Sequence, residues 1–420
     1  RTVESFVRLC KYHPSGTPAH SYNNEPNGAK ADPPEQEHLP NDDLAKILRQ
    51  SGTHGAGGPS QWRKGLLVGL LNAPWAFQAW AAFLGRLMRG HVPADVNHVM
   101  GWCTLHGLLK SAMSLDVRPL GVGEFFRRNI GSTLLRVKRA GFRAFFFDRV
   151  AIAAAAGQRK PVQFAVGLPA GADMMAHAVR LLLAADSERI AIKIDCKNAF
   201  NSVERATTLQ ALRRQFPSIA EFFTRSYTSV KPGDAGPRLL FGCRDGHVRV
   251  IWSRQGTTQG DPAGPLLFAL ALHPALEAIQ TQLGDGVYIF AFSDDIIILA
   301  PPHKAALALH VAKKELGQCG LELRPDKCGV YDRLELVRGE EFTPGGTFAD
   351  VHKTPEGLMV VGSPIGTPAF VLEGLRQKGL RPAQELYAKL IQMPTAQDGL
   401  TLLRSSGITK YSYYARVTPP

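Results

Sequence analysis

The sequence Val287-Tyr-Ile-Phe-Ala-Phe-Ser-Asp-Asp-Ile-Ile-Ile-Leu299 places two adjacent acids inside an otherwise almost wholly apolar run. Its β-branched and aromatic residues predict two short buried strands joined by a tight turn at Ser293, Asp294 and Asp295. Two like charges about 4 Å apart repel by roughly 4 kcal/mol at an effective dielectric constant of about 20, so they need a cation, a basic partner or a raised pKa. A divalent metal would meet this need. The alternative is a solvent-exposed turn without chemistry, and the choice depends on other acids in the chain.

A second acid ends another predicted strand, upstream of this hairpin. Residues 189–195 have the pattern of a buried strand that ends at Asp195. Further elements are predicted as helices at 203–216, 266–283 and 304–316, a hairpin at 239–252 and the start of a strand at 321–323. With the 239–252 hairpin as an insertion, the order strand, helix, hairpin, helix, strand is that of a split βαβ arrangement, an antiparallel sheet backed by two helices. Asp195 and the hairpin acids would then meet on neighbouring strands.

Such a carboxylate cluster has a specific chemical use. Three carboxylates from Asp195, Asp294 and Asp295 could hold two divalent ions, which together activate an attacking hydroxyl and stabilise a pyrophosphate leaving group. The chain carries a formal charge of +13 and has a pI of about 9.6, which favours a polyanionic partner such as nucleic acid. The cluster and the basic composition together predict phosphoryl or nucleotidyl transfer.

Composition sets the remaining limits. A chain of 420 residues with 45% hydrophobic content can bury a large core, and its length favours two to three domains. Its six cysteines form no Cys-x-x-Cys pair, which favours a reducing compartment, and the first residues lack the order of a secretory signal. The uncharged run between Lys64 and Arg86 reaches transmembrane length, but Asn72, Pro74 and Gln78 at its centre favour a pair of buried helices without a membrane span.

The other segments give less specific predictions. Residues 1–62 are rich in Pro and Gly around one short predicted helix at 41–50, which indicates a flexible extension. Residues 91–113 are predicted to be helical. Residues 127–149 predict a strongly basic helix that could hold phosphates, or alternatively a solvated helix face. Residues 172–185 have helical spacing.

Three blocks follow one another in a distinctive order: Asp195-Cys-Lys-Asn-Ala-Phe-Asn-Ser202, Gln259-Gly-Asp-Pro-Ala-Gly-Pro-Leu-Leu-Phe268 and Phe292-Ser-Asp-Asp295. They resemble motifs A, B and C of the reverse transcriptases of non-LTR (LINE-type) retrotransposons. Further stretches resemble the fingers motifs at 118–124 and 163–180, motif D at 320–327 and the primer-grip motif E at 361–366. The resemblance covers roughly residues 105–415.

The resemblance implies an α+β fold, the right-hand polymerase with fingers, a ferredoxin-like split βαβ palm and a partial thumb. Its antiparallel sheet would be backed by helices. The implied domains are a flexible N-terminal extension at 1–62, N-terminal helices and fingers at 63–186, a palm at 187–365 with a fingers insertion at about 217–254, and the start of a thumb at 366–420.

The resemblance also implies a set of metal ligands and a cofactor. Asp195 and Asp294 would be the main ligands, with the backbone carbonyl of Cys196 as a further ligand and Asp295 as the third acid. The cofactor would be two Mg²⁺ ions, with Mn²⁺ as an alternative. Lys327 would be the proton donor to pyrophosphate.

Substrate contacts are implied by the same comparison. Phe200 would exclude a ribose 2′-hydroxyl, Gln259 with Gly260 would contact the incoming nucleotide and the template, and Lys110 and Arg118 would hold the triphosphate. The primer grip would be formed by Gly362, Ser363, Pro364, Ile365 and Gly366. In two places the sequence departs from the family pattern: Ser293 replaces the usual Ala, and no basic, glycine-containing turn lies between Lys110 and Arg118.

The implied function is that of an RNA-directed DNA polymerase, a nucleotidyltransferase that adds dNTPs to a primer 3′-hydroxyl. Its partners would be an RNA template, a DNA primer or target DNA, and dNTPs, with no membrane. It would act inside the cell, in the nucleus and in a cytoplasmic ribonucleoprotein. Two alternatives stay open: an inactive or domesticated RNA-binding remnant of such an element, and an RNA-dependent RNA polymerase, against which Phe200 argues.

Overall fold

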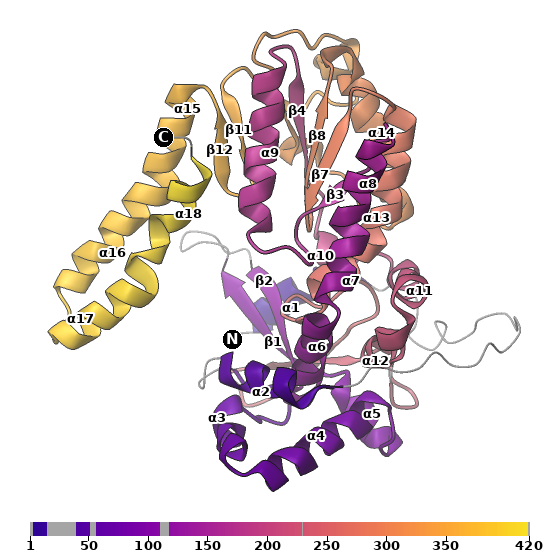
Figure 1. Cartoon of the computed structure of the whole chain (residues 1–420), viewed down its shortest axis with the longest axis vertical. Coiled ribbons are helices and arrows are strands. Elements are labelled where there is room, and N and C mark those ends of the chain that lie inside the picture. The colour runs from indigo at the N-terminus through magenta and orange to yellow at the C-terminus, as the bar shows by residue number, and fades with distance from the viewer. Residues whose placement is uncertain (1–2, 15–38, 51–55, 110–116, 229, 419–420) are drawn as a thin grey trace, which may run out of the picture. The chain divides into compact units, whose positions relative to one another are not determined.

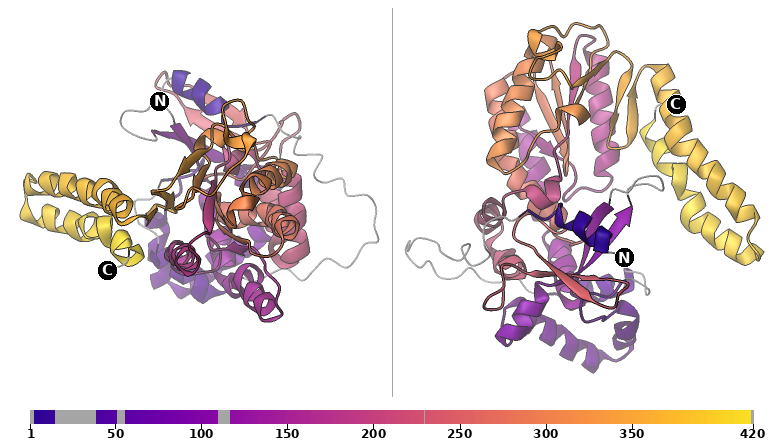
Figure 2. Two further views of the ribbon diagram at one scale, coloured as in Figure 1. Left: turned by 90° about the horizontal axis from the view of Figure 1, so that it is seen from above. Right: turned by 180° about the vertical axis from the view of Figure 1, so that it is seen from behind.

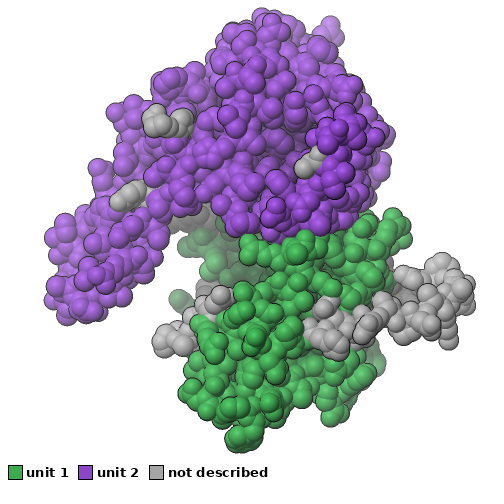
Figure 3. Space-filling model, in the orientation of Figure 1, with its two compact units in different colours: residues 1–142, 198–272, 319–321 green, residues 143–197, 273–318, 322–420 purple. Residues whose placement is uncertain are grey.

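The computed structural model describes residues 3–14, 39–50, 56–109, 117–228 and 230–418 (Figure 1). The chain divides into two compact units, which Figure 3 shows in different colours. Unit 1 consists of Arg1–Phe142, Asn198–Leu272 and Cys319–Leu321, and unit 2 of Arg143–Lys197, His273–Gln318 and Glu322–Pro420. Each unit is formed by segments that are distant in the sequence, so both depend on long-range contacts.

Unit 2 is built on a six-stranded sheet of order β10-β9-β4-β8-β7-β3. Its strands are β3 (Val162–Gln163), β4 (Ile190–Ile194), β7 (Tyr288–Phe292), β8 (Asp295–Ala300), β9 (Gly329–Tyr331) and β10 (His352–Thr354). Strand β4 pairs antiparallel with both β8 and β9, and β7 pairs antiparallel with β8. The order β9-β4-β8-β7 is the ferredoxin-like split βαβ order, so the predicted fold class is confirmed.

Both faces of this sheet are buried. Helix α9 (Gly171–Ala185) places Met175 and Val179 in one core cluster with Phe290 and Ile297 of the central strands. Because side chains alternate along a strand, the adjacent Ile296 and its neighbours on the same face point away from this cluster, and they too are almost fully buried. Figure 1 shows α9 lying along the sheet. This double burial explains why the hairpin sequence is apolar almost without interruption.

The predicted strand at 321–323 is wrong. Leu323 forms only an isolated antiparallel bridge with Cys196, and the paired strand β9 begins at Gly329, after a short 3-10 turn at Pro325–Lys327. Pro325 explains the shift, because proline has no N–H to donate and restricts the residue before it. The predicted helix at 304–316 is confirmed as α14 (Ala305–Gln318), preceded by a short 3-10 turn.

The C-terminal part of unit 2 consists of a small hairpin followed by helices. Strands β11 (Gly357–Val360) and β12 (Ser363–Gly366) pair antiparallel. The helices that follow are α15 (Pro368–Leu375), α16 (Arg381–Ile391), α17 (Ala396–Leu402) and α18 (Thr409–Val417). Figure 2 shows these helices as two packed rows.

Unit 1 contains a four-stranded sheet of order β2-β1-β5-β6. Its strands are β1 (Cys103–Leu109), β2 (Val117–Gly123), β5 (Arg238–Gly242) and β6 (Val248–Trp252). The helices that lie wholly in unit 1 are α1 (Val3–Cys10), α2 (Asn41–Gln50), α3 (Lys64–Leu67), α4 (Pro74–Met88), α5 (Ala94–Met100), α6 (Phe125–Val137), α10 (Ala199–Ser202), α11 (Arg205–Gln215) and α12 (Pro217–Thr228). Three helices complete the chain: α7 (Arg139–Arg143), α8 (Arg149–Ala155) and α13 (Gly264–Leu283).

In unit 1 one predicted element is wrong, and one segment contains a helix that the sequence did not predict. The predicted helical region 91–113 is helical only over α5, and then becomes strand β1, because residues 103–109 pair with β2 along their whole length. The segment 1–62 contains, in addition to the predicted helix at 41–50, the helix α1, whose fully buried Leu9 packs in one cluster with Leu105 and Phe241. Tertiary pairing and burial thus decide both segments.

The apolar run 64–86 and the basic segment 127–149 are both helical for most of their length. In the run 64–86, α4 begins at Pro74 and buries Trp80 and Leu84, while Trp75 is largely exposed. Among the described residues, no helix is both long and apolar enough to cross a membrane.

Candidate functional site

Two of the three predicted acids lie at the same end of neighbouring strands in the sheet of unit 2. Strands β4 and β8 pair antiparallel, and the pair nearest to this end is Ile194 with Ile296. Asp195 directly follows β4, and Asp295 is the first residue of β8. Burial is the main cause that raises the pKa of Asp195, and the negative charge of Asp295 adds to it, as expected for neighbouring carboxylates. Asp294 lies at the exposed end of the turn between β7 and β8.

The surroundings of Asp195 are electrostatically mixed. Partial burial is the main cause that raises its pKa, and the cations Lys327, Lys193 and Arg324 oppose this effect. The Nζ atom of Lys193 lies 4.0 Å from Oδ1 of Asp295 and donates a hydrogen bond of 3.2 Å to the carbonyl of Met359. The two carboxylates thus lie in a basic environment, which suits negatively charged ligands such as phosphates.

The backbone of Asp195 is held on both of its polar groups. Its carbonyl accepts a hydrogen bond of 2.9 Å from Arg324 N, and its N–H donates to the Sγ atom of Cys328 at 3.4 Å. Burial raises the pKa of the Cys328 thiol to about 11, so this thiol is neutral at physiological pH. The bridge between Cys196 and Leu323 uses the carbonyls of Asp195 and Glu322.

The turn that carries the two hairpin acids is held by a glutamine from another strand. Ser293 adopts a left-handed φ of 55°, a conformation that costs a residue other than glycine about 1–3 kcal/mol. Its N–H donates to Oε1 of Gln163 at 3.0 Å, and the same oxygen accepts from Ala165 N at 3.1 Å. Gln163 is almost fully buried at the end of β3. Sequence reasoning missed this role because nothing local in the sequence pairs Gln163 with the hairpin.

The donor set suits a hard divalent cation. Mg²⁺ is commonly bound by one or two carboxylates together with substrate phosphates, and Asp195 and Asp295 supply two half-exposed carboxylates at one end of the sheet. Among the residues that the structure describes, no group of three or more His, Cys, Asp or Glu side chains is placed to hold a metal ion.

The predicted primer-grip residues, 362–366, form the turn and second strand of the β11–β12 hairpin. Its two turn residues, Val361 and Gly362, have φ values of 44° and 84°, the pattern of a type I′ hairpin turn. Arg180 on α9 donates to Ser363 Oγ and to the carbonyl of Pro364, both at 3.1 Å. These bonds attach the hairpin to α9.

Helix α18 provides a second attachment for this hairpin. The Tyr413 hydroxyl donates to the Val361 carbonyl at 2.7 Å, and the Ser363 hydroxyl donates to the Val417 carbonyl at 3.5 Å. Burial raises the pKa of Tyr413 to about 12, so the hydroxyl remains a donor at neutral pH. The turn of the hairpin is thus fixed from two helices that are distant in the sequence.

In unit 1, Phe200 is placed by an aromatic partner. Its ring stacks on Phe268 of α13, with a centroid distance of 4.7 Å and an interplanar angle of 15°. The carbonyl of Phe200 accepts a hydrogen bond of 2.6 Å from Thr257 N. Phe268 is fully buried and Phe200 is half-buried. The buried Phe268 ring therefore supports the Phe200 ring, which remains partly accessible.

Gln259 and Gly260 form the tip of a tight turn in unit 1. Gly260 has a φ of +99°, and a Cβ atom there would lie 2.7 Å from the carbonyl oxygen of Gly121. The Gln259 carbonyl accepts a hydrogen bond of 2.7 Å from Gly121 N. Only glycine fits at position 260, because both the φ value and the close backbone approach exclude a side chain.

The remaining predicted residues are exposed or lie outside the described residues. Arg118 is exposed on β2 of unit 1, and Lys327 is exposed in unit 2, where its charge acts on Asp195. Lys110 lies outside the residues that the structure describes.

Part of the chain matches a known protein family. Residues 158–342 match the family described as reverse transcriptase (RNA-dependent DNA polymerase). The Pol polyprotein of the type-1 retrotransposable element R2 from Nasonia vitripennis is 32% identical over 195 residues, 41% of this chain and 18% of that protein. The corresponding protein of Popillia japonica is 23% identical over 271 residues, 56% of this chain and 42% of that protein. The chain thus spans less than half of the length of these curated relatives.

Solved structures with a similar arrangement are telomerases. That of Candida albicans, in complex with a fragment of telomeric RNA, is 12% identical with a TM-score of 0.44 and covers 76% of this chain and 56% of its own. Apo telomerase from Candida tropicalis is 12% identical with a TM-score of 0.41, covering 70% of this chain and 52% of its own. Residues 158–342 of the chain therefore match the reverse transcriptase family, and the chain is similar in sequence to the Pol polyproteins of two R2 retrotransposable elements.

Proposed function

We propose that this protein is an RNA-directed DNA polymerase that adds deoxynucleotides to a primer 3′-hydroxyl on an RNA template. The observation that carries the proposal is that Asp195, which follows β4, and Asp295, which begins the neighbouring strand β8, lie at the same end of the sheet, inside the region that matches the family. Two strand-borne carboxylates in a basic environment suit metal-assisted nucleotidyl transfer. The proposed partners are an RNA template, a DNA primer or target DNA, and dNTPs. Action in the nucleus and in a cytoplasmic ribonucleoprotein is part of the same proposal.

Asp195, Asp295 and Asp294, with the Cys196 carbonyl, are the proposed ligands of two Mg²⁺ ions, which Mn²⁺ can replace. When bound, the metal supplies activation of the primer hydroxyl and stabilisation of the pyrophosphate. The protein contributes the fixed positions of the acids: Asp195 through the bonds to Arg324 N and Cys328 Sγ, and the hairpin turn through Gln163.

Proton donation and phosphate binding are assigned to lysine and arginine side chains. Lys327 is the proposed proton donor to pyrophosphate, because it is exposed and its charge acts on Asp195. Arg118, and Lys110 by resemblance alone, are proposed to hold the triphosphate of the nucleotide.

Phe200 is proposed to select the sugar. A ring stacked firmly on Phe268 cannot move aside easily, so it would exclude a ribose 2′-hydroxyl. Gln259 and Gly260 are proposed to contact the nucleotide and the template, and residues 362–366 to hold the primer end. In this proposal residues 63–186 supply N-terminal helices and fingers, 187–365 the palm with an insertion at about 217–254, and 366–420 the start of the thumb.

Primer extension on an RNA template tests the proposal. Wild-type protein should extend a DNA primer with dNTPs in the presence of Mg²⁺, and Asp294→Ala should abolish extension. Equal extension by wild type and variant would exclude the proposed metal site. Salt-sensitive RNA binding without any Mg²⁺-dependent synthesis would instead identify an RNA-binding remnant.

Sugar selection needs its own assay. Phe200→Ala should allow ribonucleotides to be incorporated, while dNTP addition continues. If the ratio of dNTP to rNTP use were unchanged in this variant, the assignment of Phe200 would be wrong, and an RNA polymerase activity would come back into consideration.

A further inference from the structure

The Gln259–Gly260 tip belongs to a four-residue turn with its own closing bond. Asp261 N donates to the Thr258 carbonyl at 3.1 Å, and the positive φ of Gly260 at the third position gives the pattern of a type II turn. Gln259 therefore stands at the second position, where the backbone conformation of the turn sets the direction of its side chain. Any group that holds both ends of this turn also sets where Gln259 points.

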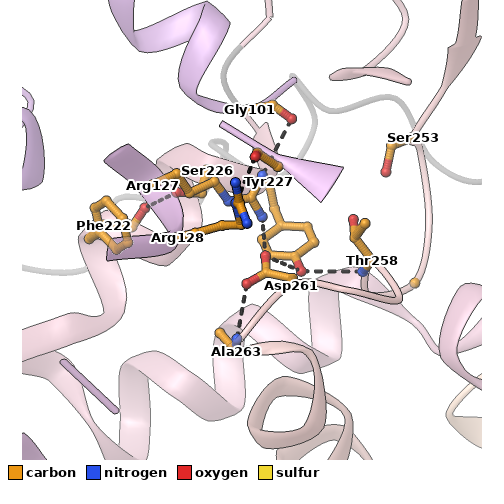
Figure 4. Close-up of polar contacts among 12 residues, drawn as sticks. Gly101, Arg127, Arg128, Phe222, Ser226, Tyr227, Ser253, Thr258, Asp261 and Ala263 are labelled. Carbon is orange, nitrogen blue, oxygen red and sulfur yellow. Dashed lines mark hydrogen bonds and ion pairs between the residues drawn. The ribbon is translucent and has the colours of Figure 1, made fainter. Parts of the chain in front are cut away.

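One buried hydroxyl joins the two ends of the turn. The Tyr227 Oη atom on α12 accepts a hydrogen bond from Thr258 N at 3.2 Å and donates one to Oδ2 of Asp261 at 2.9 Å (Figure 4). Tyr227 is 2% exposed. Burial, followed by the charge of Asp261, raises the pKa of Tyr227, which keeps the hydroxyl protonated and able to donate.

The charge of Asp261 is balanced by a buried arginine. Arg127 of α6 forms an ion pair with Asp261, and both side chains are almost fully buried. The other carboxylate oxygen of Asp261 accepts from Ala263 N at 2.9 Å. Arg127 also packs over the Tyr227 ring, 4.7 Å from its centroid, and donates to the Gly101 carbonyl at 3.4 Å. Figure 4 shows the arginine, the acid and the tyrosine converging on the turn.

A second buried arginine holds the segment that leads into the turn. Arg205 of α11 lies 5.2 Å from the centroid of the Tyr227 ring and donates to the carbonyls of Gln255 and Gly256, at 2.8 and 3.1 Å. Arg205 is 1% exposed. The path from Gln255 to Asp261 is therefore attached to α6, α11 and α12 at fixed points.

A buried ion pair is a poor source of stability, because removing both charges from water offsets most of their attraction, and apolar residues of the same size often serve as well. Such a pair is better explained by the exact placement it enforces. We infer that Tyr227 is a positioning residue for nucleotide binding, and that its hydroxyl, held with Asp261 and Arg127, sets the conformation in which Gln259 and Gly260 meet the incoming nucleotide. This inference rests on the proposed polymerase function.

Tyr227→Phe removes the single bridging oxygen and keeps the ring that Arg127 and Arg205 contact. The matched control is Ser226→Ala, which removes a buried hydroxyl from the adjacent residue of α12. That hydroxyl donates to the Phe222 carbonyl at 2.9 Å, within the helix and away from the turn. The two variants delete one hydroxyl each from the same turn of the same helix.

Two measurements on the whole chain separate the outcomes. In steady-state primer extension, Tyr227→Phe should raise the KM for dNTP about tenfold, the factor that corresponds to one lost hydrogen bond, with kcat and primer-template affinity changed less than about threefold. In amide hydrogen exchange without substrates, the peptide that contains Thr258–Asp261 should exchange faster in Tyr227→Phe than in wild type or Ser226→Ala.

Each result decides a different statement. An unchanged KM for dNTP in Tyr227→Phe, with an active wild type, overturns the inference, as does an equal rise in Ser226→Ala. Unchanged exchange at Thr258–Asp261 would show that the Tyr227 hydroxyl does not hold this turn. If wild type extends no primer, the proposed function fails. Faster exchange in Tyr227→Phe would then still show that the Tyr227 hydroxyl holds the turn in the folded protein.

Discussion

The side chain of Gln163 holds the backbone of Ser293: its Oε1 atom accepts the Ser293 N–H at 3.0 Å, although 130 positions separate the two residues in the chain. Ser293 is the residue that carries the strained left-handed φ of 55° before the two hairpin acids. A buried acceptor at this point stabilises the turn from which Asp295 enters β8, the strand that pairs with β4.

Gln163→Met should therefore impair catalysis more than folding. The substitution leaves the Ser293 N–H without its acceptor, a loss of about 1–3 kcal/mol, and a displaced turn should lower kcat for primer extension by about 10- to 100-fold. Gln280→Met is the matched control, because Gln280 is also buried and donates to the Val287 carbonyl, at the start of the hairpin. A fall in kcat of the same size in both variants would contradict the specific role of Gln163.

Asp195→Asn should abolish extension and yet make the protein more stable at neutral pH. Burial raises the pKa of Asp195, so the folded state binds its proton more tightly than the unfolded state does. The Asp195 carboxyl therefore adds to the free energy of unfolding in acid, and this contribution is lost as the pH rises through the raised pKa. Asn carries no charge and is spared this loss.

Thermal melting in metal-free buffer tests the direction of this pH dependence. The melting temperature of Asp195→Asn, relative to wild type, should rise between about pH 4 and about pH 7. If the difference between the two proteins were independent of pH, the cost of the ionised carboxylate would be absent.

Arg180→Met should loosen the β11–β12 hairpin. The variant loses two charge-assisted hydrogen bonds, to Ser363 Oγ and the Pro364 carbonyl, each worth about 1.5–3 kcal/mol when buried. Because this hairpin is the proposed primer grip, the Kd for primer-template, measured by fluorescence anisotropy, should rise about tenfold. Arg333→Met, which removes an exposed arginine bound to the Ser187 carbonyl, should leave this Kd unchanged. Equal weakening in both would indicate a general effect of charge.

Gly260→Ala should lose polymerase activity because two separate constraints act at this position. Its φ is +99°, and an added Cβ would lie 2.7 Å from the Gly121 carbonyl oxygen. Gly233 has a φ of +87° with open space around it, so Gly233→Ala experiences the conformational strain alone. Primer extension by Gly233→Ala at the wild-type rate, with loss in Gly260→Ala, is the expected result. Full activity in Gly260→Ala would show that the turn can move without consequence.

Elements with a strong local residue pattern are predicted correctly from the sequence. The strands around Asp294 and Asp295, the strand that ends at Asp195, and the helix α14 are each recognisable from period and composition. Segment 91–113 was misread because its apolar content suits a helix as well as a strand, and pairing with β2 makes its second half a strand.

The sequence alone predicts the main elements and the acids at their ends: a strand that ends at Asp195 and a hairpin that turns at two acids. The tertiary structure adds that Asp295 begins the strand next to the one that Asp195 follows, and that Gln163 and Tyr227 hold the two turns. This division follows from the range of the forces involved. Side-chain period and backbone preference act between near neighbours, whereas strand register and the partners of buried polar groups arise from contacts between residues far apart in the chain.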